Sequence, residues 1–99
     1  NLDIKYLIFS GIGNPSDFKD ILIENKFNVK EEIIFPDHYS YKSNDFEKII
    51  AKAKNENLQI LTTEKDYMKI PEEFKKEIDF ISIDLIIQNE EKFIELLNN

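Results

Sequence analysis

The sequence predicts an α/β fold, a three-layer α/β/α sandwich around a small, mostly parallel sheet of four strands. Short apolar runs rich in β-branched and aromatic residues alternate with segments whose apolar residues recur at helical spacing. Each strand-like run is followed by such a segment, so the order is β-α-β-α-β-α-β-α. Right-handed crossovers then make the strands parallel. We expect a Rossmann-like sheet with strand order 2-1-3-4.

The first half of the chain supplies two of these strands and one helix. Residues 4–10 form an apolar run with the length of a buried strand. Asn14 then suits a helix cap, Pro15 suits the first helical position, and Asp17 favours the positive end of the helix. Residues 28–35 form the second strand, whose polar beginning predicts a position at the sheet edge.

The second half continues the alternation. A helix capped by Ser43 or a neighbour should bury Phe46, Ile49 and Ala53 on one face. The remaining expected elements are a strand at residues 58–62, a short helix that begins at Thr63 and is interrupted by Pro71, a short helix or turn after it, a strand at 79–87 and a last helix from about Asn89.

Composition narrows the function classes. The chain has 99 residues, the size of one domain, and a formal net charge of −7. This charge argues against nucleic acid and against an anionic membrane surface as partners. With no cysteine and one histidine, a protein metal site is not expected. No apolar run is long enough to span a membrane. Because the chain opens with Asn1 almost directly into a strand, we expect a piece of a longer protein.

Three unusual segments fall where strands end. They are the glycine loop (FSGIGNP, residues 9–15), the histidine loop (FPDHYSY, residues 35–41) and the threonine turn (TTEKD, residues 62–66). In an open parallel sheet, ligands bind outside the carboxyl ends of the strands. The sequence therefore predicts that the three segments share one functional edge.

The glycine loop and the threonine turn each have a functional and a purely structural interpretation. Gly11, Gly13 and Asn14 precede a helix, so they either hold an anion or form a tight turn. They do not complete a dinucleotide fingerprint, because Ser16 occupies the third glycine position. In the threonine turn, a Thr-x-x-acid spacing is typical of a capping box. Lys65 is either solvated there or faces a ligand.

The histidine loop collects titratable groups at the predicted edge. His38 lies between Asp37 and Tyr39, just after a strand. A histidine can accept a proton, or can orient a carboxylate beside it. An inert surface histidine is the ordinary alternative. No self-contained catalytic set is visible, so the loop resembles half of an active site.

The three phrases, in this order and spacing, resemble those of the tetraacyldisaccharide 4′-kinases, the lipid A kinases of Gram-negative bacteria. The resemblance runs to about residue 70. It implies transfer of the ATP γ-phosphate, with Mg²⁺, to the 4′-hydroxyl of tetraacyldisaccharide 1-phosphate, the lipid A disaccharide precursor. The complete enzyme would act at the cytoplasmic face of the inner membrane and would fold as two α/β/α domains.

The resemblance places residues 1–99 in the smaller C-terminal domain. The partner would be the enzyme's own N-terminal P-loop domain, whose motifs do not occur here. The active-site histidine of the family falls on His38, and Asp37 and Tyr39 would hold the loop or touch ligand. Further residues that would face substrate or nucleotide are Gly11, Gly13, Asn14, Thr63 and Lys65. No cofactor is expected to bind this domain tightly, and the domain alone is expected to be inactive.

A second interpretation comes from another class of protein. The complete βα pattern also suits a stand-alone α/β module that binds a small anion or a partner protein without catalysis. The three phrases in register favour the kinase.

Overall fold

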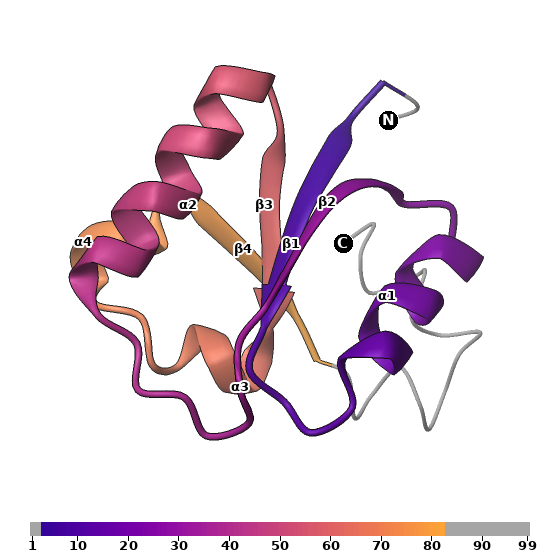
Figure 1. Ribbon diagram of the computed structural model, residues 1–99. Coiled ribbons are helices and arrows are strands. Elements are labelled where there is room, and N and C mark those ends of the chain that lie inside the picture. Colours follow the sequence, from indigo (N-terminus) through magenta and orange to yellow (C-terminus); the bar gives the residue numbers. More distant parts are fainter. Residues whose placement is uncertain (1–2, 83–99) are drawn as a thin grey trace.

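The computed structural model describes residues 3–82 of the chain and confirms the predicted α/β fold. Its four strands are all parallel and lie in the order β2-β1-β3-β4, as predicted (Figure 1). The strands are β1 (Lys5–Ser10), β2 (Asn28–Ile34), β3 (Gln59–Thr63) and β4 (Ile78–Ile81).

Helices cover both faces of this sheet. In Figure 1, α1 lies on one side of the strands, whereas α2 and α4 lie on the other. The helices are α1 (Pro15–Glu24), α2 (Ser43–Glu56), α3 (Glu64–Tyr67) and α4 (Glu72–Lys75). The described part of the fourth strand ends at Ile81, and residues 83–87 of the predicted strand lie outside the described residues. The predicted last helix lies outside the described residues.

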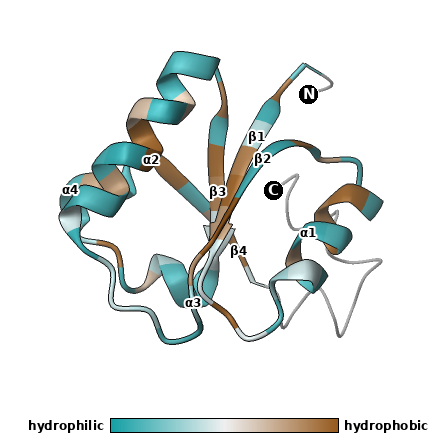
Figure 2. Ribbon diagram, viewed as in Figure 1, coloured by the Kyte–Doolittle hydropathy of each residue, from teal (hydrophilic) through white to brown (hydrophobic). Residues whose placement is uncertain are grey.

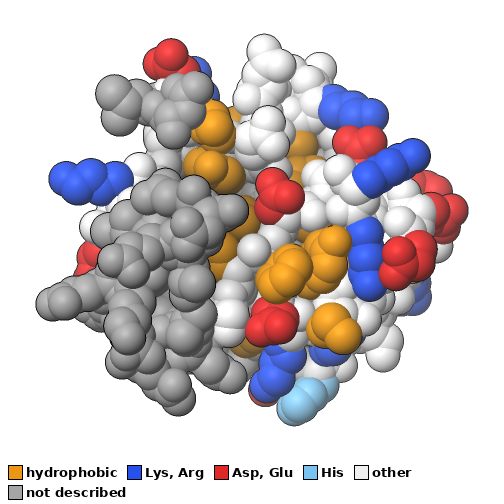
Figure 3. Space-filling view, turned by 180° about the vertical axis from the view of Figure 1, so that it is seen from behind, with side chains coloured by type: hydrophobic (Ala, Val, Ile, Leu, Met, Phe, Trp, Pro, Cys, Tyr) orange, Lys and Arg blue, Asp and Glu red, His pale blue; other side chains and the backbone are white. Residues whose placement is uncertain are grey.

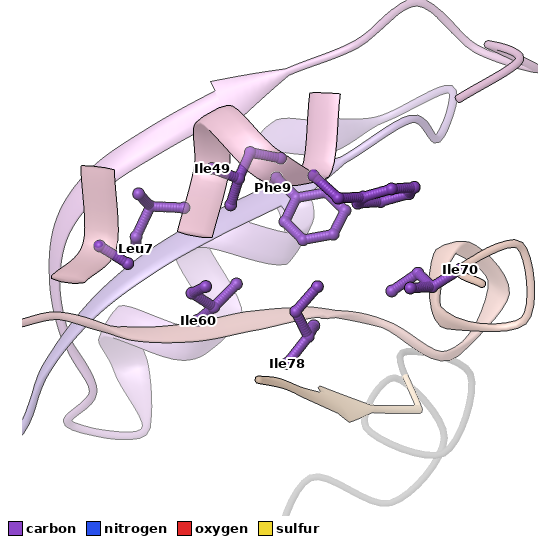
Figure 4. Packing of buried hydrophobic residues seen from close by; sticks show 8 residues of the cluster. Leu7, Phe9, Ile49, Ile60, Ile70 and Ile78 are labelled. Atoms are coloured by element: carbon purple, nitrogen blue, oxygen red, sulfur yellow. The ribbon is translucent and has the colours of Figure 1, made fainter. Parts of the chain in front are cut away.

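The core consists of two clusters, one on each face of the sheet. Successive side chains of a strand point to opposite faces, and β1 shows this directly. Leu7 and Phe9 pack with α2, while Ile8 packs with α1. Figure 4 shows the α2 cluster from close by, and Figure 2 shows the apolar strands between helices with polar outer surfaces. The α2 cluster is Leu7, Phe9, Phe46, Ile49, Ala53, Ile60, Ile70 and Ile78, and the α1 cluster is Ile8, Phe18, Leu22, Leu61 and Ile81.

The polar beginning of β2 is explained by its place at the sheet edge. Adjacent residues Glu31 and Glu32 face opposite sides of the sheet, and each meets a lysine of the helix on its side. Glu31 lies 3.8 Å from Lys52 of α2, and Glu32 lies 3.6 Å from Lys19 of α1. Such exposed pairs stabilise the fold little, but they keep an edge strand charged.

The helix caps lie where predicted, at Asn14 and at a neighbour of Ser43, but their polar contacts differ from those of a standard N-cap. Lys42, the residue before Ser43, precedes α2, and its backbone N–H donates to the Asp45 carboxylate at 2.9 Å. Asn14 occupies the cap position of α1, but its side chain donates to Asp17 at 2.6 Å instead of accepting a backbone N–H. In both places an acidic side chain of the first turn supplies the polar contact.

Candidate functional site at the carboxyl edge of the sheet

The three predicted segments meet at one buried carboxylate, that of Asp66. Its exposed fraction is 1%. The Gly11 N–H donates to both carboxylate oxygens at 3.1 Å, and the Tyr41 hydroxyl donates to Oδ1 at 2.9 Å. The Thr63 hydroxyl donates to Oδ2 at 2.6 Å. We call Asp66 with these three donors the Asp66 clasp. It joins the glycine loop, the histidine loop and the threonine turn at the carboxyl ends of the strands.

The local sequence explains how Asp66 reaches this position. Thr63 ends β3 and caps α3, and its hydroxyl oxygen accepts the Asp66 N–H at 3.0 Å, as the predicted capping box requires. The Asp66 carboxylate does not turn back to the cap backbone. It accepts the Thr63 hydroxyl and points inward, between the two loops. The hydroxyl of the preceding residue on β3, Thr62, donates to the Phe9 carbonyl at 2.7 Å and links β3 to β1.

Gly11 is favoured by the limited space around it and not by an unusual backbone angle. A β-carbon at this residue would lie 3.2 Å from the Tyr41 hydroxyl oxygen and 3.3 Å from Asp66 Oδ1. It would also lie 3.3 Å from the Pro36 carbonyl oxygen. These are crowded approaches to two groups of the clasp and to a carbonyl of the histidine loop. The glycine therefore lets the two loops and the carboxylate pack together.

The histidine loop presents its imidazole to solvent. The Phe35 N–H donates to the Ser10 carbonyl at 2.8 Å, and the Tyr39 N–H donates to the Pro36 carbonyl at 3.0 Å, which closes a four-residue turn. His38 is the third residue of that turn and has φ of 62°, a value that is uncommon for residues other than glycine. Its side chain is 88% exposed, with Nε2 3.7 Å from Asp37 Oδ2. Figure 3 shows the histidine at the rim of the molecule.

Three aromatic rings of this loop pack against one another. The Phe35 ring lies 4.9 Å from that of Tyr39 and 5.0 Å from that of Tyr41, and the two tyrosine rings lie 5.3 Å apart. The Tyr39 hydroxyl donates to Asp45 at 3.0 Å, and this bond raises the pKa of Tyr39. Burial, together with the Asp66 carboxylate, raises the pKa of Tyr41 far above its ordinary value. Both phenols therefore remain donors at neutral pH.

The other predicted site residues differ in their surroundings. Gly13 is exposed beside the histidine loop, and a β-carbon there would lie 3.4 Å from Asp37 Oδ2. The Asn14 side chain also accepts the Ser16 hydroxyl at 3.2 Å. Its other partner, the carboxylate of Asp17 described above, occupies the first turn of α1, and a negative group there disfavours a phosphate. Lys65 is exposed on α3.

Sequence reasoning did not place Asp66 or Tyr41 in the site. Asp66 was interpreted only as the acid of a capping box, which needs no partner outside its own turn. Thr63 was expected to face a ligand, and in the structure it is buried and donates within the clasp. One feature of the sequence could have indicated this arrangement. Asp66 follows an apolar strand whose last two residues are threonines.

Neither a metal site nor a membrane span is found in the part of the chain that the structure describes. Within residues 3–82 no three acidic, histidine or cysteine side chains come together as metal ligands. The described residues therefore offer no three-ligand protein site for a metal ion. No helix among them is long and apolar enough to cross a bilayer.

The fold and its loops define a class, a parallel α/β domain whose polar loops meet at the carboxyl edge of the sheet and which has no metal-ligand cluster among residues 3–82. Comparison with known proteins makes the class specific. The sequence model of the tetraacyldisaccharide-1-P 4′-kinases matches residues 2–99. The chain belongs to this family, a family of phosphotransferases.

Individual relatives agree with the family match. The chain is 41% identical over 95 residues to a tetraacyldisaccharide 4′-kinase of Pelagibacter ubique, covering 96% of this chain and 30% of the relative. It is 38% identical over 84 residues to the Rickettsia akari protein of the same name, covering 85% of this chain and 26% of the relative. The chain thus spans less than a third of the length of these relatives. No solved structure gives a significant match.

Proposed function

We propose that this chain is the C-terminal domain of a tetraacyldisaccharide 4′-kinase and that it presents His38 to an active site shared with an N-terminal P-loop domain. The reaction is transfer of the ATP γ-phosphate to the 4′-hydroxyl of tetraacyldisaccharide 1-phosphate. It takes place at the cytoplasmic face of the inner membrane. Family membership supports the reaction, and the short share of each relative that the chain covers supports its place as one domain of a larger enzyme.

The observation that carries the role of His38 is its presentation. The residue has a left-handed backbone at the tip of a loop held from both sides, yet its imidazole is 88% exposed. A left-handed conformation outside glycine is unfavourable, and such residues cluster at functional sites. An imidazole that the domain holds in place but does not bury is available to a group outside the domain.

The imidazole has a defined task in this proposal. Phosphoryl transfer depends on positioning and on stabilising charge, with a base that accepts the proton of the attacking hydroxyl. His38 orients that base, or carries part of the charge as the proton leaves the 4′-hydroxyl. Closure of the two domains also excludes water that would otherwise accept the phosphate. Mg²⁺ would supply positive charge that offsets the charge on the phosphates. Because the described residues hold no Mg²⁺ ligand set, its ligands and the phosphate cradle belong to the other domain.

The test is the turnover of the complete kinase with His38→Asn. Asparagine also tolerates the left-handed backbone, so this variant removes the imidazole and keeps the turn. We expect kcat to fall by about a hundredfold or more, the scale of general acid–base participation. Ser40→Ala, at an exposed neighbour in the same loop, is the matched control and should retain the wild-type rate. A His38→Asn enzyme with nearly normal kcat would refute the role of this histidine.

A further inference from the structure

Asp66 has more hydrogen bonds than a helix cap needs. The Thr63 hydroxyl oxygen already caps α3 by accepting the Asp66 N–H, and a four-residue helix requires no buried charge for that purpose. The carboxylate is nevertheless almost completely buried. Among the described residues its partners are the neutral donors of the clasp, and none of the ion pairs there includes it. Burying a carboxylate is unfavourable unless several hydrogen bonds compensate it.

The donors of the clasp come from distant parts of the chain. Gly11 lies 55 residues before Asp66, and Tyr41 lies 25 residues before it. The two donors belong to the loops that follow β1 and β2, which are neighbouring strands. One side chain on α3 therefore ties the glycine loop to the histidine loop. Because both loops bond to the same buried carboxylate, the carboxylate restrains the position of one loop relative to the other.

Hydrogen bonds hold the histidine loop on both sides of the turn that carries His38. The Phe35 N–H bond to Ser10 holds the beginning of the histidine loop, and the Tyr41 bond to Asp66 holds its end. Between these points the imidazole has one polar neighbour among the described residues, Asp37 at 3.7 Å. The position of the imidazole is therefore set by the loop backbone and not by contacts of its own.

We propose that Asp66 is a positioning residue for phosphoryl transfer, because its bonds to Gly11 and Tyr41 hold the histidine loop in the conformation that presents His38. This inference rests on the proposed function of His38. Asp66 does not touch the reacting groups in this proposal. It acts only through the loop, so its effect on turnover must disappear once the imidazole has been removed.

A double-mutant cycle in the complete kinase tests this dependence. Asp66→Asn keeps the size of the side chain but replaces one acceptor oxygen with an NH₂ group, so at least one donor loses its partner. We expect kcat to fall about 10- to 100-fold, the cost of misplacing a catalytic group by about 1 Å, with the KM for ATP little changed. In a His38→Asn background, the same substitution should cause no further loss of kcat.

Two additional variants keep the test decisive. Glu64→Gln removes a charge from an exposed residue of the same helix and should leave kcat unchanged. If Asp66→Asn does not fold, Tyr41→Phe removes one clasp donor and should show a smaller loss with the same dependence on His38. Hydrogen exchange of the Phe35 and Tyr39 amides should accelerate in either clasp variant, because both amides close the loop.

The outcomes separate the two proposals. Normal turnover of His38→Asn overturns the proposed function, and the positioning role with it. If His38→Asn is impaired, the positioning role alone is overturned by a fully active Asp66→Asn enzyme, by equal losses in both backgrounds, or by unchanged exchange of the loop amides.

Discussion

At the scale of single residues, the site depends on how one carboxylate is satisfied. Asp66 is buried without a cationic partner among the described residues, and three neutral donors take the place of water. Removing one partner of a buried charged hydrogen bond costs about 1–3 kcal/mol, because the group left behind cannot recover its solvation. Tyr41 is the donor that can be removed with the least change of shape.

Tyr41→Phe should lower the free energy of unfolding by about 1–3 kcal/mol at pH 8. The difference in unfolding free energy between wild type and variant should become smaller as the pH rises above about 10. The folded pKa of Tyr41 is raised by burial and by Asp66, whereas in the unfolded chain it is about 10. The contribution of Tyr41 is therefore complete below pH 10. Above about pH 10 the unfolded state loses this proton first, so wild-type stability falls more steeply than that of the phenylalanine variant.

Urea unfolding of both chains at several pH values from 8 to about 11 measures this effect. Tyr6 and Tyr39 also have raised pKa values, but they are present in both chains and cancel in the comparison. If the difference in unfolding free energy between wild type and Tyr41→Phe stays constant across pH 10, Tyr41 ionisation is not linked to folding.

At the scale of elements, the two long helices, α1 and α2, end with the same hydrogen-bond pattern but with different residues in the left-handed conformation. After α1, the Phe27 N–H donates to Leu22 and the Lys26 N–H donates to Ile23, which is the pattern of a Schellman motif. Leu58 and Asn57 repeat it after α2. Both motifs need a left-handed residue, Lys26 with φ of 71° and Asn57 with φ of 60°. Asparagine adopts this conformation more readily than lysine.

Lys26→Gly should therefore raise the free energy of unfolding by about 0.5–1 kcal/mol. Glycine has no β-carbon to clash in the left-handed conformation, and this gain exceeds the extra entropy of glycine in the unfolded chain. Chemical denaturation measures the change. Glu24→Gly, inside the last turn of α1, is the matched control and should lower stability by up to about 1 kcal/mol. If both variants lower stability equally, the strain assigned to Lys26 is absent.

At the scale of the whole molecule, charge and architecture determine what the domain can do alone. The net charge is −7, and on the face shown in Figure 3 lysines and acids are interspersed instead of forming a basic patch. The first turn of α1 carries Asp17 in contact with Asn14. These features leave no cradle for phosphate at this edge of the described domain.

We accordingly expect this 99-residue chain to bind ATP–Mg²⁺ weakly or not at all. The measurement is an NMR titration of the chain to millimolar nucleotide, with Mg²⁺ alone as the control for changes in ionic strength. Saturating shifts around His38 would contradict the expectation and would assign nucleotide contact to this domain.

Much of the fold was predictable because its signals are local. The continuous apolar run that contains Leu7, Ile8 and Phe9 predicted a buried strand, and the polar beginning of β2 predicted an edge. The convergence of the three loops at one edge followed from parallel topology. Element ends were less predictable. β3 runs from Gln59 to Thr63, one residue later than predicted at each end, and β4 begins one residue earlier than predicted, because hydrogen bonds and not periodicity decide where an element begins and ends.

The sequence by itself determined the strand order, the two apolar faces and the family, because periodicity and the three phrases are properties of neighbouring residues. Only the tertiary structure decided that Asp66 joins the three loops, one of which carries the exposed His38. The partners of Asp66 lie 25 and 55 residues away. No local pattern records which side chain of a capping box turns inward, since that choice depends on donors that only folding brings within reach.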